Sequence, residues 1–146
     1  MKARQNISRS PAETRTVAGE LAQTLPDGTV VALCGTLGSG KTCFVQGMAL
    51  ALGVAEPVTS PTFALVHQYA GRRALCHVDL YRIAEAADLD GLGLDDCLDP
   101  AGLAAFEWAD RAPDLFPPGT VWVHLSMLPG RGRRRIAVTL APPPPA

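Results

Sequence analysis

The sequence predicts a single α/β domain in which a mixed, partly antiparallel sheet is flanked by helices. A buried, β-branched run at 29–35, TVVALCG, is followed at once by a glycine-rich octapeptide and then by a helical pattern. Two strand-like runs around a turn at 70–72 indicate a hairpin, and therefore antiparallel strands. The chain has 146 residues, which suits one domain with one hydrophobic core.

Two helices are expected, one before the buried run and one after it. The first begins at Ser10, because serine is a good N-cap, Pro11 suits the first helical position and Glu13 completes a capping box. Apolar residues follow at helical spacing until Pro-Asp-Gly at 26–28 ends the helix. The second helix carries apolar residues on one face over 44–52.

The remaining chain predicts further strands and few other features. Strands are expected as a hairpin within 61–83, and at 102–108, 120–125 and 134–140. The acidic stretch at 84–100 indicates a short helix and a loop. We expect a flexible N-terminus over 1–9, the domain over 10–140 and a disordered proline-rich tail over 141–146.

Composition points to a cytoplasmic protein. The net charge of −1 gives no general attraction to nucleic acid or to a membrane surface. The N-terminus lacks the apolar run of a signal peptide, and no apolar run is long enough to span a membrane. The four cysteines form no C-x-x-C pair, so we expect reduced, buried thiols and no zinc site.

The octapeptide GTLGSGKT at 35–42, here called the phosphate loop, satisfies the pattern G-x-x-x-x-G-K-[ST] between a strand and a helix. Glycines let the backbone wrap around a phosphate, and the helix N-terminus adds positive potential. Of 13 basic residues only Lys2 and Lys41 are lysines, and a lysine reaches between phosphates where an arginine fork does not fit. The loop therefore predicts a P-loop nucleoside-triphosphatase-like domain that binds a nucleoside triphosphate and Mg²⁺. Its candidate nucleotide contacts are Gly35, Leu37, Gly38, Ser39, Gly40, Lys41 and Thr42.

Two acidic residues end strand-like runs and are candidates for holding the metal or polarising water. Asp79 lies in CHVDLYR, and Glu107 lies in LAAFEW after four apolar residues, as expected of a central strand. The run before Asp79 contains His77, which favours a strand nearer the sheet edge. A solvated strand end is the alternative for either acid.

Five motifs occur in this order along the chain: PAET at 11–14, the phosphate loop, SPTF at 60–63, HVDLYR at 77–82 and EW at 107–108. Together they resemble the TsaE family, which supplies a small ATPase for making threonylcarbamoyladenosine in bacterial tRNA. The resemblance covers about residues 10–140, and the combination is far more specific than the phosphate loop alone.

The resemblance implies a slow, Mg²⁺-dependent ATPase. It implies that the protein acts with TsaB and TsaD, that TsaD carries the transferase chemistry, and that ATP hydrolysis resets their complex, with tRNA involved only indirectly. By motif, Lys41 binds phosphate, and Thr42 and Glu107 hold Mg²⁺. Asp79 is the catalytic carboxylate, alongside Lys41 as a candidate catalytic residue.

The resemblance also reaches residues outside these motifs. Thr62 and Ser60 are expected near the γ-phosphate or the partner surface. A basic residue of RGRRR is expected to approach the nucleotide, and Arg133 is the preferred candidate. The chain departs from the family at Thr36, where aspartate is common, and at Cys43, where threonine is common.

Two other functions share a phosphate loop. A small-molecule or nucleotide kinase needs a second pocket and usually an arginine-bearing lid, and the segment between Gly53 and Glu107 suggests none. A GTP-binding switch typically carries an N/T-K-x-D segment, which a chain with lysine only at positions 2 and 41 lacks. The kinase remains the alternative to the regulatory ATPase.

Overall fold

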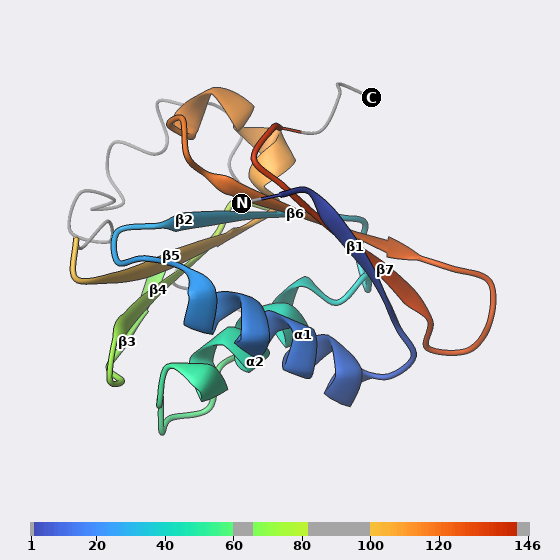
Figure 1. Cartoon of the computed structure of the whole chain (residues 1–146), viewed down its shortest axis with the longest axis horizontal. Helices are drawn as coiled ribbons and strands as arrows, with labels where there is room; N and C mark the ends of the chain where they lie inside the picture. Colours follow the sequence, from blue (N-terminus) through green and yellow to red (C-terminus); the bar gives the residue numbers. More distant parts are fainter. Residues whose placement is uncertain (1, 60–65, 82–99, 143–146) are drawn as a thin grey trace.

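The computed structural model describes residues 2–59, 66–81 and 100–142. Its strands are β1 (Arg4–Ser8), β2 (Val30–Cys34), β3 (Val66–Tyr69), β4 (Ala74–Asp79), β5 (Gly102–Glu107), β6 (Val121–Met127) and β7 (Arg134–Thr139). Its α-helices are α1 (Pro11–Thr24) and α2 (Lys41–Ala51), and two 3-10 turns are η2 (Ala109–Arg111) and η3 (Pro113–Leu115). Within the described ranges, the strands form one seven-stranded sheet in the order β1-β7-β6-β2-β5-β4-β3. The predicted single α/β domain with a mixed sheet is confirmed (Figure 1).

The start of α1 follows the predicted capping box in part. The Ser10 side chain accepts a hydrogen bond from the Glu13 backbone N–H at 3.1 Å, as predicted, whereas the Glu13 carboxylate accepts one from the backbone N–H of Arg9, the residue before the cap. Pro11 occupies the first helical position, where its missing N–H costs nothing. The local sequence therefore fixes where this helix begins.

The centre of the sheet is parallel. β2 runs parallel to β5 and β6, and β4 runs parallel to β5, so the carboxyl ends of β2, β5 and β4 lie side by side at the same end of the sheet. In the register, Glu107 lies between Leu33 of β2 and Asp79 of β4. All six residues of β5 are buried, whereas β4 is separated from the sheet edge only by β3. This confirms that Glu107 ends a central strand and Asp79 one nearer the edge.

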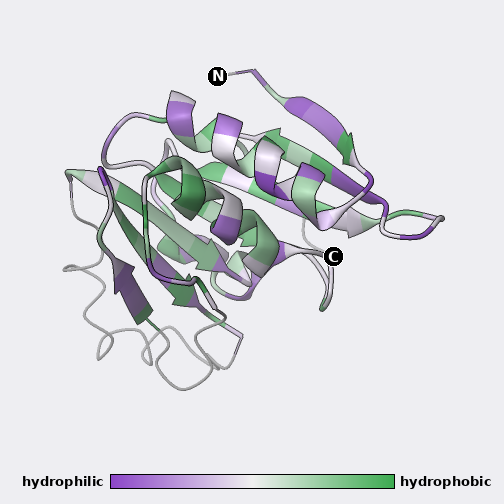
Figure 2. Ribbon diagram, turned by 90° about the horizontal axis from the view of Figure 1, so that it is seen from below, coloured by the Kyte–Doolittle hydropathy of each residue, from purple (hydrophilic) through white to green (hydrophobic). Residues whose placement is uncertain are grey.

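Apolar side chains cover both faces of the sheet. α1 and α2 pack together on one face of the sheet (Figure 2). Leu21, Phe44 and Met48 of these helices belong to one buried apolar cluster with residues of the strands. On the opposite face, Phe106, Phe116 and Trp122 form edge-to-face ring pairs at 5.1–5.2 Å. The two layers hold the central strands rigidly, so residues at their ends have fixed positions.

Two features differ from the sequence-based expectations. Residues 4–8 lie in the expected flexible N-terminus 1–9, yet they form β1 and pair antiparallel with β7. Four of these five residues are exposed, so the pairing, not an apolar pattern, makes the strand. Cys76 is disulfide-bonded rather than reduced, because sequence spacing does not show which cysteines meet in space, whereas Cys34 and Cys43 are free.

Some predicted segments lie outside the described residues. They are the SPTF segment, the acidic stretch over 84–99 and the end of the tail. Among the helices of the parts that the structure describes, none is long and apolar enough to cross a membrane.

Candidate functional site

The phosphate loop connects the end of β2 to the first turn of α2, and its backbone requires glycine at two positions. Gly40 is the N-cap of α2 and has φ of 107°, which L side chains rarely adopt. A Cβ atom on Gly35 would lie 2.5 Å from the Leu125 carbonyl oxygen and 2.5 Å from Ser39 Oγ. The loop therefore lies close to its surroundings, and a side chain at Gly35 would displace it.

The loop leaves polar groups available at the start of α2. Within the part of the chain that the structure describes, no side chain caps this helix, and the buried Ser39 hydroxyl has no hydrogen-bond partner. A Cβ atom on Gly38 would meet nothing within 4 Å, and the Leu37 side chain is 77% exposed. Uncapped N–H groups at a helix start, beside open space, fit a bound phosphate.

Lys41 lies inside the loop in this structure. Its Nζ atom donates to the carbonyl oxygens of Gly35 at 2.6 Å and Thr36 at 2.9 Å. The residue is only 5% exposed. Burial lowers the pKa of the Lys41 ammonium, and the nearby charges of Glu107 and Asp110 oppose that change. Two hydrogen bonds that the Lys41 ammonium could make to a phosphate are thus made to backbone carbonyl oxygens instead.

Trp108 covers the same lysine. The Lys41 Nζ atom lies 3.7 Å from the centre of the indole ring. Trp108 is also the one non-glycine residue with positive φ, 58°, in the described ranges. The centres of the Trp108 and Tyr81 rings are 4.8 Å apart, and the Arg111 guanidinium lies over both rings. The tryptophan noted in the EW motif is therefore part of the loop's surroundings.

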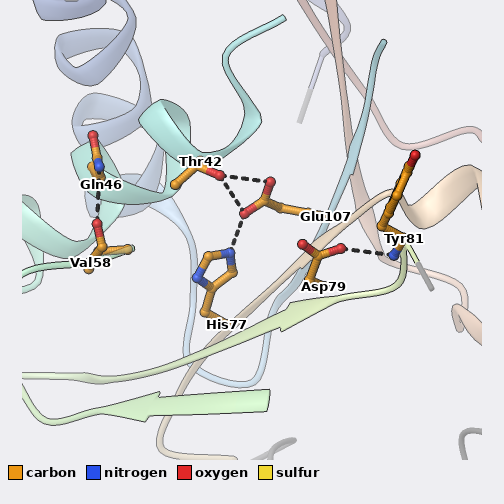
Figure 3. Close-up of polar contacts among 7 residues, drawn as sticks. All are labelled: Thr42, Gln46, Val58, His77, Asp79, Tyr81 and Glu107. Atoms are coloured by element: carbon orange, nitrogen blue, oxygen red, sulfur yellow. Dashed lines mark hydrogen bonds and ion pairs between the residues drawn. The ribbon is translucent and has the colours of Figure 1, made fainter. Parts of the chain in front are cut away.

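Glu107 joins the phosphate loop to the sheet. Thr42 Oγ1 donates to both carboxylate oxygens of Glu107 at 3.0 Å, and His77 Nε2 lies 2.5 Å from Oε2 of the same carboxylate (Figure 3). Glu107 is 3% exposed and His77 fully buried. These three residues come from α2, β5 and β4, so only the fold brings them together.

Asp79 lies beside this group, opposite Glu107 in the β4–β5 register. Its Oδ1 atom accepts a hydrogen bond from the Tyr81 backbone N–H at 2.8 Å (Figure 3). The side chain is largely buried. The structure thus places both predicted carboxylates at the carboxyl ends of the parallel strands, where the phosphate loop also begins.

The oxygen atoms of Thr42 and Glu107 fit a magnesium ion held together with nucleotide phosphates. Mg²⁺ is usually bound by one or two protein oxygens, waters and phosphates. No cluster of three or more His, Cys, Asp or Glu side chains suited to a metal occurs among the described residues. The donor set is hard and oxygen-based, as magnesium requires.

Two predicted nucleotide contacts, Thr62 and Arg133, stay predictions. Thr62 lies outside the described residues. Just before that segment, Gln46 of α2 donates a hydrogen bond to the Val58 carbonyl at 3.0 Å (Figure 3). Arg133 donates to the Pro129 carbonyl of its own turn. Its role as a nucleotide contact stays a prediction.

Sequence reasoning missed two residues near the loop. Arg134, next to the preferred Arg133, donates to the Gly38 carbonyl at 3.1 Å. For His77, the sequence pattern indicates only the position of its strand in the sheet. Its place two residues before Asp79 on one strand could have revealed it, because such residues share a face of the sheet.

Comparison with known proteins identifies relatives over most of the chain. Residues 8–136 match the model of a family described as "Threonylcarbamoyl adenosine biosynthesis protein TsaE". Over 132 residues the chain is 41% identical to the "tRNA threonylcarbamoyladenosine biosynthesis protein TsaE" of Treponema pallidum, covering 90% of this chain and 97% of that protein. The Bacillus subtilis protein of the same name is 37% identical over 109 residues, covering 74% of this chain and 68% of that one.

A solved structure shows the same fold. The crystal structure of YdiB from Bacillus subtilis matches with a TM-score of 0.80 and 29% identity, covering 96% of this chain and 87% of that one.

Proposed function

The chain belongs to the TsaE family, and from this premise we propose that it binds and slowly hydrolyses Mg-ATP in support of tRNA threonylcarbamoyladenosine biosynthesis. The observation that carries the proposal is the Thr42–Glu107 contact at the start of α2, where a hydroxyl and a carboxylate converge beside the phosphate loop. A phosphate-binding backbone next to a magnesium-compatible oxygen pair supports nucleotide chemistry.

Each residue has a role in this proposal. Lys41 turns from the Gly35 and Thr36 carbonyls to the phosphates, exchanging neutral acceptors for charged ones, with which hydrogen bonds are stronger. Thr42 and Glu107 hold Mg²⁺, which when bound stabilises negative charge on the phosphate oxygens. Asp79 orients the attacking water from the neighbouring strand end.

The reaction is proposed to serve other proteins. The family resemblance implies TsaB and TsaD as partners, with TsaD performing the transfer and ATP turnover on this chain resetting their complex. A loop that touches the γ-phosphate can order or relax with the state of the nucleotide, so the surface around Ser60–Phe63 and Tyr81–Arg82 is our candidate for the nucleotide-sensitive contact. tRNA contact is proposed to be indirect.

The test measures association and turnover together. Binding of the purified chain to TsaB–TsaD is followed by calorimetry with ATP, ADP or no nucleotide. We expect slow turnover alone and tightest association with ATP. Equal affinity in all three conditions would refute the regulatory part, and rapid phosphorylation of a small metabolite by the isolated chain would support a kinase instead.

A further inference from the structure

We propose that His77 is a positioning residue that orients the Glu107 carboxylate for Mg²⁺. The inference rests on the proposed function. Its observation is the buried contact between His77 Nε2 and Glu107 Oε2 at 2.5 Å, on the carboxylate that Thr42 also contacts (Figure 3). Neither side chain has freedom to move, because His77 is fully buried and Glu107 is 3% exposed.

The chemistry of the two groups fixes which atom carries the proton. An ionised carboxylate only accepts hydrogen bonds, so the ring must donate from Nε2. His77 Nδ1 is buried and has no partner among the described residues. A bare nitrogen lone pair there leaves no N–H donor unsatisfied, so the neutral tautomer with its proton on Nε2 fits the site.

This bond has a consequence for the metal site. Among the described residues, Oε2 accepts from both His77 and Thr42, whereas Oε1 accepts from Thr42. When Thr42 turns its hydroxyl oxygen toward a metal ion, His77 is the contact that still holds Glu107. Hydrogen bonds behind a metal-binding group fix its orientation, and their loss commonly costs about 10- to 100-fold in metal affinity.

The sheet supplies a matched control. His67 of β3 is directly opposite His77 in the antiparallel register, yet its side chain is 43% exposed and its ring stacks on Tyr69. The same substitution at the two positions therefore compares the loss of a buried histidine that contacts Glu107 with the loss of an exposed histidine whose partners in the described parts of the chain are Glu56 and Tyr69.

The experiment compares ADP binding by calorimetry with Mg²⁺ and with a chelator. In His77→Leu, we expect the Mg²⁺-dependent gain in affinity to fall about 10-fold or more, while affinity in the chelator stays within about twofold of wild type. His77→Gln, whose amide can place a donor near the position of Nε2, should restore most of the gain. His67→Leu should leave it unchanged.

A second measurement does not depend on the metal or on the variants folding. Nitrogen-15 spectra of the nucleotide-free wild-type protein should show the His77 proton on Nε2 and a bare Nδ1. A ring protonated on Nδ1 alone would overturn the inference. So would an unchanged Mg²⁺ gain in a folded His77→Leu variant while wild type binds Mg-ADP. Wild-type protein that binds no nucleotide would instead overturn the proposed function, and this inference with it.

Discussion

The ammonium group of Lys41 lies 3.7 Å from the centre of the Trp108 ring and donates hydrogen bonds to two backbone carbonyls of the phosphate loop. The lysine is thus held by the loop to which it belongs. Trp108 adopts a left-handed backbone conformation, which costs an L residue about 1–2 kcal/mol. The fold therefore maintains a strained residue directly against the proposed phosphate-binding group.

Lys41→Ala should abolish most ATP binding. Each charge-assisted bond to phosphate contributes about 1.5–3 kcal/mol, so affinity should fall at least tenfold. The fold should survive, because the side chain contacts the loop rather than the apolar core. Calorimetric titration with Mg-ATP measures the effect. Lys2→Ala, at the other, exposed lysine, is the control, and equal affinity of both variants would contradict the phosphate-binding role.

Glu107→Gln should weaken Mg-ATP binding while metal-free ADP binding changes little. The substitution keeps the shape of the side chain and removes the charge that would face the metal. Both affinities are measured on the same protein, so the pair of values is its own control. An equal loss for the two ligands would indicate a structural role for the contact between Thr42 and Glu107.

Asp79→Asn should bind ATP normally and hydrolyse it about 10²–10⁴-fold more slowly, the usual range for a lost general base. Steady-state phosphate release measures turnover, and calorimetry measures binding. Asp114→Asn, at an exposed position in η3, is the matched control. Unchanged hydrolysis in Asp79→Asn would exclude this carboxylate from catalysis.

Arg134→Ala should reduce nucleotide affinity more than Arg133→Ala does. Arg134 donates to the Gly38 carbonyl of the phosphate loop, whereas Arg133 donates to Pro129 of its own turn. Removal of the first contact loosens the loop, and removal of the second leaves it intact. A larger loss for Arg133→Ala, measured with Mg-ADP, would instead support Arg133 as the nucleotide contact.

Cys34 should resist alkylation in the folded protein. Burial, with a contribution from Asp110, raises the pKa of its thiol to about 12, so the reactive thiolate is scarce at pH 8. Cys43 is less buried and should react first, as mass spectrometry after iodoacetamide treatment can show. Equal labelling of both cysteines at pH 8 would contradict the prediction.

The raised pKa of the Cys34 thiol in the folded state also affects stability. Its contribution to the free energy of unfolding is fully present below pH 9 and should be lost as pH rises from 9 toward 12.

Much of the fold follows from local sequence because its signals are local. Ser10, Pro11 and Glu13 fix the start of α1 through contacts within one turn. β5 shows its burial directly, since its residues are all apolar apart from Gly102 and the terminal Glu107. β1 escaped prediction because its stability comes from hydrogen bonds to a strand more than 100 residues away, which no local pattern records.

The phosphate loop, the two carboxylates and the family can be recognised from the amino-acid sequence, because these signals are residue types at fixed short spacings. The three-dimensional arrangement is needed to see that Lys41 lies against Trp108, that Arg134 reaches Gly38, and that Thr42 and His77 meet at Glu107. Those contacts join residues 30 or more positions apart, and the order and register of the sheet strands bring them together.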